Sequence, residues 1–170
     1  MCAAPRQPSP QPGSTGGRWP ALLLLLLAVF AVAGIGGLAA SGAGSFYAML
    51  ERPAWAPPAW VFGPVWTVLY VTVAVAAWLV LRRSGGATVR TAMLWWGVQL
   101  ALNCAWTPLF FAARQYGLAF ADICLLLASV VVTAVLFGRI HRPAAWLLLP
   151  YAAWVAFAAC LNLALWQLNT

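Results

Sequence analysis

Charged side chains are scarce in this chain of 170 residues, of which only 6% are Asp, Glu, Lys or Arg. There is no lysine, and the only acidic residues are Glu51 and Asp122. A soluble domain carries about a quarter charged residues, because solvated groups must cover its core. The composition therefore excludes an ordinary soluble domain, and the 65% of hydrophobic residues predicts a surface that faces lipid.

Residues that bind metals are equally sparse. The four cysteines form no CxxC pair, and the lone His141 has no cysteine or carboxylate at ligand spacing. The sequence therefore argues against a metal site, and we expect no cofactor. Cys104, Cys124 and Cys160 lie in apolar segments, where we expect them to be small packing residues.

Nine arginines bring the net charge to +7, a value that is also found in nucleic-acid-binding proteins. Here they lie between apolar runs instead of forming a patch, so we expect no nucleic-acid partner. Seven of them fall before the first run or near residues 82–90 and 139–142, and only Arg52 and Arg114 fall on the other side. In a bacterial inner membrane this bias predicts an inside N-terminus and an outside C-terminus.

Long apolar runs dominate the rest of the chain. A Pro, Gly and Ser-rich segment over residues 1–18 is predicted to be a disordered tail. Five runs of roughly 20 residues or more follow, each long enough to cross a bilayer as a helix; they cover residues 19–40, 58–81, 91–111, 118–137 and 144–168. We therefore predict an all-α integral membrane protein, with a five-transmembrane-helix bundle over residues 19–170.

The first run has a second interpretation. Arg6 and Arg18 precede a leucine-rich stretch that ends in Ala31-Val32-Ala33, as in a cleaved signal peptide. Hydrophobicity continues beyond Ala33, however, which favours a membrane span. Both interpretations stay open at this point, with the retained span preferred.

Residues 55–66, WAPPAWVFGPVW, hold the densest motif. Pro57 and Pro58 predict an extended segment that leads into a helix, because proline at a first helical position loses no hydrogen bond. Trp66 and Tyr70 are four residues apart and share a helix face. Trp55 and Trp60 fit an interfacial aromatic belt equally well, whereas the deeper Trp66 is expected to form the wall of a pocket.

Two further helix faces carry polar or aromatic stripes. Gln99, Asn103, Trp106 and Phe110 lie on one face of the third predicted helix, which must look into the bundle because amides in lipid need partners. Hydrogen bonding between helices without a ligand explains Asn103 equally well, and it is the preferred interpretation for Gln99. On the last helix, Tyr151, Trp154, Ala158 and Leu161 form another inward stripe, beside Asn162.

Asp122 is the only carboxylate within or near a predicted span. An intramembrane carboxylate is a functional hypothesis by default. It lies one turn into the fourth predicted helix, however, where capping that helix or pairing with Arg114 would be a purely structural role. We favour the structural interpretation.

Small residues repeat at every fourth position of the third predicted helix, at Gly97, Ala101 and Ala105. Such stripes allow helix backbones to approach closely in lipid. Two copies of the chain joined through this stripe as a homodimer are one interpretation, which the family resemblance described below favours. Packing against another helix of the same chain is the alternative.

Several blocks of this sequence together resemble the TspO/MBR family, which includes the tryptophan-rich sensory proteins and the translocator protein. The resemblance extends over roughly residues 20–168, in the order and spacing of the family. It is carried by residues 55–66, 99–103 (QLALN), 106–111 (WTPLFF), 121–122 (AD), 150–154 (PYAAW) and 161–162 (LN).

The resemblance implies a bundle of five helices with a pocket that opens toward the loop after the first helix. Known ligands of the family are porphyrins and, in animal members, sterols and drug-like compounds. Members also tend to form dimers, and they lie in bacterial cell membranes or organellar outer membranes; for this chain we expect the bacterial cell membrane. By this resemblance the pocket would be lined by Trp66, Tyr70, Asn103, Trp106 and Trp154, with Tyr47 near its lid.

These implications lead to a receptor or carrier for porphyrins and similar flat hydrophobic ligands, and not to an enzyme. The alternatives are a porphyrin-degrading enzyme that uses light and a cholesterol-binding translocator. The enzyme lacks support because no nucleophile–base pair is visible. Sterol binding is weakened because no basic residue follows Tyr151, as the cholesterol-recognition pattern of animal members requires.

Overall fold

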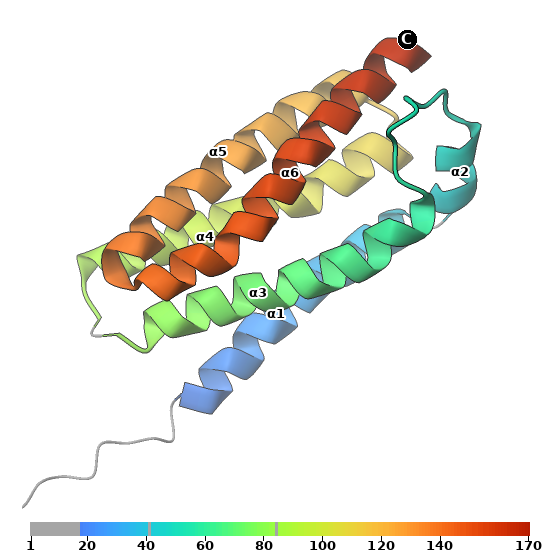
Figure 1. Cartoon of the computed structure of the whole chain (residues 1–170). Coiled ribbons are helices and arrows are strands. Elements are labelled where there is room, and N and C mark those ends of the chain that lie inside the picture. Colours follow the sequence, from blue (N-terminus) through green and yellow to red (C-terminus); the bar gives the residue numbers. More distant parts are fainter. Residues whose placement is uncertain (1–17, 41, 84) are drawn as a thin grey trace, which may run out of the picture.

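The computed structural model describes residues 18–40, 42–83 and 85–170, and within these ranges the regular structure is helical. Five long helices run side by side, and the two described ends of the chain lie at opposite ends of the bundle (Figure 1). The long helices are α1 (Arg18–Ala39), α3 (Phe62–Leu81), α4 (Ala87–Thr107), α5 (Tyr116–Ile140) and α6 (Arg142–Asn169). The predicted tail lies outside the described residues, apart from Arg18.

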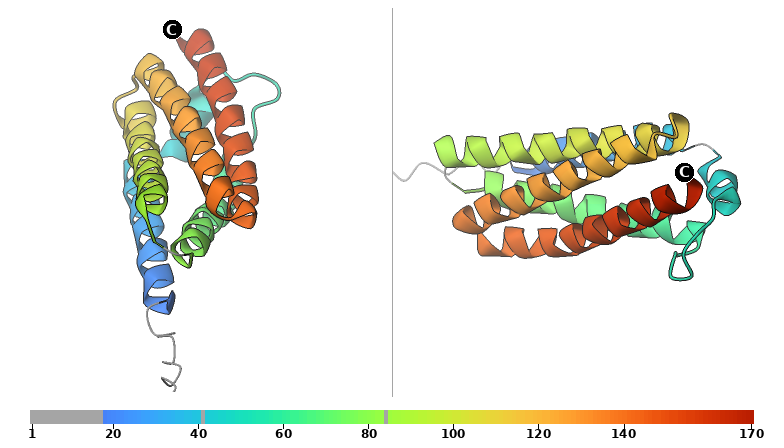
Figure 2. Two further views of the ribbon diagram at one scale, coloured as in Figure 1. Left: turned by 90° about the vertical axis from the view of Figure 1, so that its left-hand side faces the viewer. Right: turned by 90° about the horizontal axis from the view of Figure 1, so that it is seen from above.

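Three short elements complete the chain. They are α2 (Ala43–Met49), the 3-10 turn η2 (Ala59–Val61) and the π-helical turn η3 (Pro108–Ala112). Helix α2 and the loop that follows it sit at the end of the bundle where α6 ends, as both views of Figure 2 show. The sequence did not predict α2, because seven residues that begin beside two glycines carry too little apolar periodicity.

The helices begin and end within four residues of the predicted runs. Four of them are long and apolar enough to cross a membrane: α1, η2 with α3, α5 and α6. The predicted count of five spans is not confirmed, because α4 is less apolar than these four helices. Its polar residues Arg90, Gln99 and Asn103 lower its mean hydropathy. The chain is nevertheless an integral membrane protein with several spans.

The helices close into a ring that does not follow chain order. Helix α5 packs between α4 and α6, α3 packs against α6 and α1, and α1 returns to α4. Small residues allow these close contacts: Ala74, Ala77 and Ala92 are completely buried. At Gly117 an added Cβ would lie 2.9 Å from the Trp166 ring, so a larger residue there would force this ring of α6 to move. The ring leaves a space between all five long helices.

Candidate functional site

A cavity of about 420 Å³ occupies that space, in the half of the bundle nearest α2. A pocket of this size suits a drug-sized ligand, for which the usual range is about 300–1,000 Å³. All six residues that the sequence analysis proposed for the pocket line this one cavity: Tyr47 from α2, Trp66 and Tyr70 from α3, Asn103 and Trp106 from α4, and Trp154 from α6.

One wall of the cavity is built from aromatic side chains of α3 and α6. The Trp66 ring lies 5.5 Å from the Tyr70 ring and 6.2 Å from the Tyr151 ring, measured between centroids. The Trp154 ring lies 5.9 Å from the Phe62 ring in an edge-on arrangement. Centroid distances of 4.5–7 Å are those of interacting aromatic pairs. This wall is therefore held rigid by ring contacts between different elements.

The opposite wall depends on the π-helical turn η3. Pro108 has no N–H, so it donates no α-helical hydrogen bond to the preceding turn. The turn that begins at Pro108 is closed by a π-helical bond from Ala113 N–H to the Pro108 carbonyl, 2.8 Å long. Phe110 and Phe111 on this turn both line the cavity, and the Phe110 ring stacks on Trp106 at 5.2 Å. The π-helical turn therefore places this pair of phenylalanines in the cavity wall.

The inward amides of α4 belong to one buried hydrogen-bond chain. The Tyr70 hydroxyl donates to Asn103 Oδ1 (2.7 Å), Asn103 Nδ2 donates to the Tyr151 hydroxyl (3.2 Å), and that hydroxyl donates to Gln99 Oε1 (2.8 Å). Tyr70 and Asn103 line the cavity at one end of the chain, whereas Gln99 lies outside its lining. Gln99 therefore serves helix packing, and Asn103 combines packing with a place in the cavity wall.

A second amide joins the cavity wall to the start of α5. Asn162 Oδ1 accepts a bond of 3.0 Å from the Trp106 indole N–H, and its Nδ2 donates to the Tyr116 carbonyl, also at 3.0 Å. These bonds fix the plane of the Trp106 ring. By contrast, the Trp154 indole N–H is buried without a hydrogen-bond partner among the described residues.

Small residues of α1 form the part of the lining that the sequence analysis missed. Ala33, Gly36 and Gly37 border the cavity beside Phe30. A Cβ added at Gly36 would lie 3.3 Å from Thr107 Oγ1, whereas one at Gly37 would meet nothing within 4 Å. The sequence could not indicate these two glycines as ligand-binding residues, because they contribute to the cavity only by the absence of a side chain.

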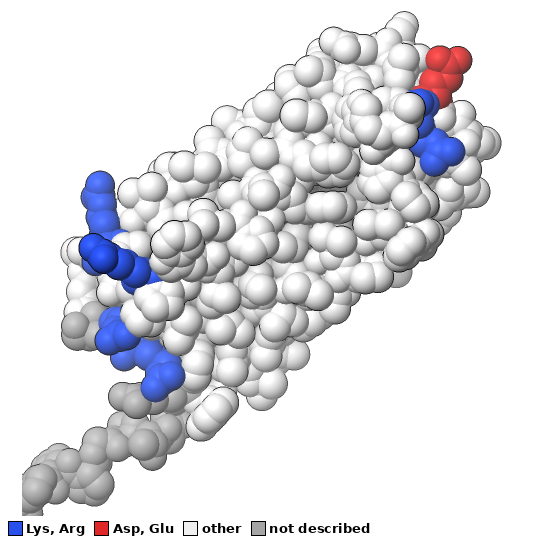
Figure 3. Space-filling view, viewed as in Figure 1, with Lys and Arg blue, Asp and Glu red and all other residues white. Residues whose placement is uncertain are grey.

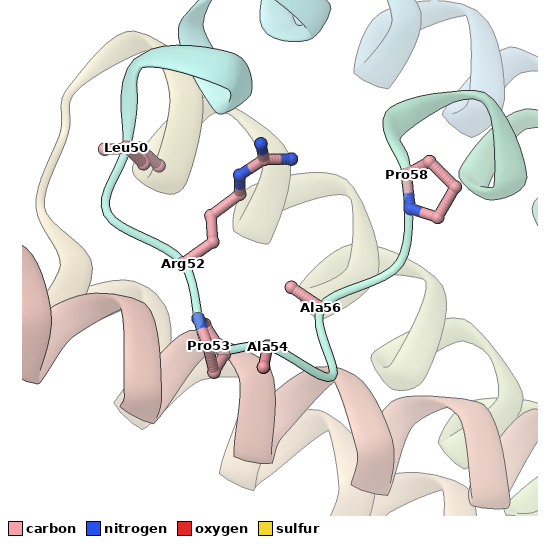
Figure 4. Close-up of a pocket in the computed structure, with 6 residues that line it drawn as sticks. All are labelled: Leu50, Arg52, Pro53, Ala54, Ala56 and Pro58. Atoms are coloured by element: carbon pink, nitrogen blue, oxygen red, sulfur yellow. The ribbon is translucent and has the colours of Figure 1, made fainter.

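Helix α2 and the loop over residues 50–58 cover the end of the cavity. The Tyr47 hydroxyl donates to the Pro57 carbonyl (3.0 Å), and the Arg52 guanidinium lies 5.0 Å from the centre of the Tyr47 ring. Burial raises the pKa of Tyr47 above its ordinary value, although Arg52 opposes this, so Tyr47 stays neutral and keeps its donor. The loop encloses a hollow of its own, toward whose middle Arg52 points (Figure 4).

The structural role proposed for Asp122 is wrong in both of its forms. Gln115 is the residue that precedes the first turn of α5, and the Arg114 guanidinium lies over the Phe46 ring, 5.0 Å from its centre. Asp122 is buried further along α5, outside the cavity lining, and its Oδ2 has no hydrogen-bond partner among the described residues. Arg114 prefers the aromatic face because α2 brings Phe46 over the start of α5.

The small-residue stripe of α4 points away from the bundle. Gly97 and Ala101 are exposed, Ala105 is half-buried, and a Cβ added at Gly97 would touch nothing within 4 Å. The alternative that this stripe packs against another helix of the same chain is therefore wrong for its first two positions. No group of three potential metal ligands gathers within the part of the chain that the structure describes.

Comparisons with known proteins agree with this arrangement. The "Translocator protein" of Ovis aries is 44% identical over 127 residues, 73% of this chain and 75% of its own length. The "Tryptophan-rich protein TspO" of Chlorobaculum tepidum is 38% identical over 125 residues, 73% of this chain and 79% of its own length. The "Tryptophan-rich sensory protein" of Cereibacter sphaeroides is 33% identical over 151 residues, 89% of this chain and 92% of its own length.

These relatives carry names of translocator and sensory proteins. The profile of one family, TspO/MBR, matches residues 23–167, a stretch that includes most of every long helix and the whole cavity lining. The chain belongs to the TspO/MBR family.

Proposed function

We propose that this protein is a membrane receptor or carrier that binds porphyrins and similar flat hydrophobic ligands in the cavity beneath α2. The observation that carries the proposal is the meeting of Trp66, Trp106 and Trp154 from three helices around one cavity. A macrocycle needs aromatic walls, and the polar groups at its rim need a few well-placed partners. The side chains of Asn103 and Tyr70, which line the cavity, supply such partners.

A side-by-side titration of the purified protein with protoporphyrin and cholesterol tests this function. We expect saturable quenching of tryptophan fluorescence by protoporphyrin, with cholesterol binding more weakly. Equal or tighter cholesterol binding would favour the second candidate, a sterol-binding translocator. That candidate is supported by the translocator protein of Ovis aries, whose identity to this chain exceeds that of the two prokaryotic relatives above.

We propose binding and not catalysis, although Trp66 and Trp154 also line the cavity as light-dependent degradation of porphyrin would require. Chromatography of the bound porphyrin after illumination separates the two. Recovery of intact porphyrin at the rate seen in protein-free detergent supports a binder, whereas an accelerated loss with defined products supports the enzyme.

We also propose that α4 is the fifth span. Its polar residues Gln99 and Asn103 turn inward and are buried, so they lower the hydropathy of the helix without facing lipid. Five spans place the two termini on opposite sides of the membrane, and the two described ends of the chain, at the start of α1 and the end of α6, lie at opposite ends of the bundle (Figure 1). Reporter fusions to each terminus should therefore give opposite activities, and equal activities would reject this topology.

We further propose a homodimer joined through Gly97, Ala101 and Ala105. Exposure of Gly97 and Ala101 supports it, since close backbone approach is the main source of helix association in lipid. Ala101→Leu should shift the protein toward monomer without altering ligand binding, because residue 101 lies outside the cavity. Cross-linking in bilayers measures the dimer fraction, with the exposed Val131→Leu on α5 as control. An unchanged fraction in Ala101→Leu would rule out this interface.

A further inference from the structure

Five arginines gather at the end of the bundle opposite α2, and we call this region the arginine end. The positive side chains cluster there on the face seen in Figure 3, away from the acidic residue at the other end. They come from four helix ends: Arg82 and Arg83 follow α3, Arg90 lies in the first turn of α4, Arg139 in the last turn of α5, and Arg142 begins α6.

No carboxylate of the chain neutralises this charge. The sequence holds only two acidic residues. Glu51 lies in the loop after α2, where its backbone bonds to Asn169, and Asp122 lies near the start of α5, so both belong to the other half of the bundle. The first turns of α4 and α6 also lack acidic residues, although the positive ends of their dipoles point to the arginine end. The arginine end therefore requires anions from outside the chain.

Two of the five arginines contact an aromatic or imidazole side chain. Arg82 lies 4.6 Å from the centre of the Trp78 ring, and Arg83 Nη2 lies 2.8 Å from His141 Nδ1, at the junction of α5 and α6. Neither contact supplies negative charge, and each guanidinium has five N–H donors. Arg90, Arg139 and Arg142 are exposed on three different helices. The five side chains thus form an open, cationic surface, and most of its donors have no partner among the residues that the structure describes.

Tryptophans at the same end indicate its depth in the membrane. Trp19 and Trp78 lie 5.7 Å apart, centre to centre, and Trp19 is 69% exposed. Trp146, one turn after Arg142, is 68% exposed. Exposed tryptophans on membrane helices lie at the level of the lipid headgroups. The arginines beside them are therefore placed where lipid phosphates are, and their planar guanidinium groups match phosphate oxygens in two-pronged hydrogen bonds.

We propose that the arginine end is a binding surface for the phosphate groups of anionic phospholipids. Each arginine near an anionic membrane surface contributes roughly a fivefold gain in binding, which corresponds to ~1 kcal/mol. Five arginines drawn from four helix ends would gather several such lipids at this end of the bundle. This surface is separate from the cavity, so the inference does not depend on the ligand proposed above.

Lipid retention tests this proposal. The full-length protein is exposed to an equimolar mixture of phosphatidylglycerol and phosphatidylcholine, purified in mild detergent, and the retained lipids are counted by native mass spectrometry. We expect phosphatidylglycerol to be enriched on the wild type. The triple variant Arg90→Gln/Arg139→Gln/Arg142→Gln should lose about tenfold or more of this enrichment. The matched control is Arg52→Gln/Arg114→Gln, which removes two arginines from the other end and should keep it.

Two further measurements keep the proposal falsifiable. If the triple variant does not fold, each single variant should lower the enrichment by roughly fivefold, and rising salt should lower it on the wild type. Inorganic phosphate should stabilise the wild type against heat much less than phosphatidylglycerol at the same concentration. Equal enrichment in the triple variant and the wild type, or equal stabilisation by inorganic phosphate, would overturn the assignment to lipid.

Discussion

Replacing Trp66 or Trp154 by alanine is expected to weaken protoporphyrin binding by about 1–3 kcal/mol each, about five- to 150-fold in Kd. The two indoles line the cavity from different helices, and each is held by neighbouring rings, so a bound macrocycle would lose one rigid wall in either variant. Fluorescence titration in detergent or nanodiscs measures the change.

Trp146→Ala is the matched control for this experiment. It removes an indole from α6, the helix that carries Trp154, but from a position that is 68% exposed to lipid. Trp154→Phe separates two contributions, because it keeps the aromatic wall and removes only the unpartnered N–H; we expect a smaller loss than in Trp154→Ala. Unchanged affinity in both alanine variants, with the fold intact, would reject the placement of the ligand.

The second large effect is expected at Asn169, the last residue of α6. Its amide holds the loop over the cavity by two bonds to the backbone of Glu51: the Glu51 N–H donates to Asn169 Oδ1, and Asn169 Nδ2 donates to the Glu51 carbonyl, each at 3.0 Å. Asn169→Leu removes both, at a cost to the closed loop of about 1–3 kcal/mol. The loop should open more often, so ligand should enter and leave about five times faster or more, with little change in Kd.

Stopped-flow measurements give both rates, and hydrogen exchange at the Glu51 amide gives a readout that needs no ligand. Gln167→Leu serves as the control, because Gln167 is exposed on the same turn of α6 but is not the residue that bonds to Glu51. If hydrogen exchange at the Glu51 amide is as slow in Asn169→Leu as in the wild type, contacts other than those of Asn169 hold the loop closed.

Several features of this protein follow from short-range patterns in the chain. A run of apolar residues must form a helix in lipid, because its backbone has no other partners there. The helix positions and the inward direction of the stripe with Asn103 and Trp106 could therefore be predicted from composition and periodicity. The resemblance to the family added which of the aromatic residues share one pocket.

Other features arise only when the helices meet. The space left by Gly36 and Gly37, the cover that α2 provides, and the bonds between Asn169 and Glu51 join residues that are far apart in the chain. The partner of Arg114 was predicted wrongly for the same reason: its guanidinium lies over a ring of α2, a helix with no signal of its own. Periodicity shows which face of a helix turns inward, but the neighbour that this face meets is decided by the order of the helices around the ring, in which α3 lies beside α6 and α1 beside α4.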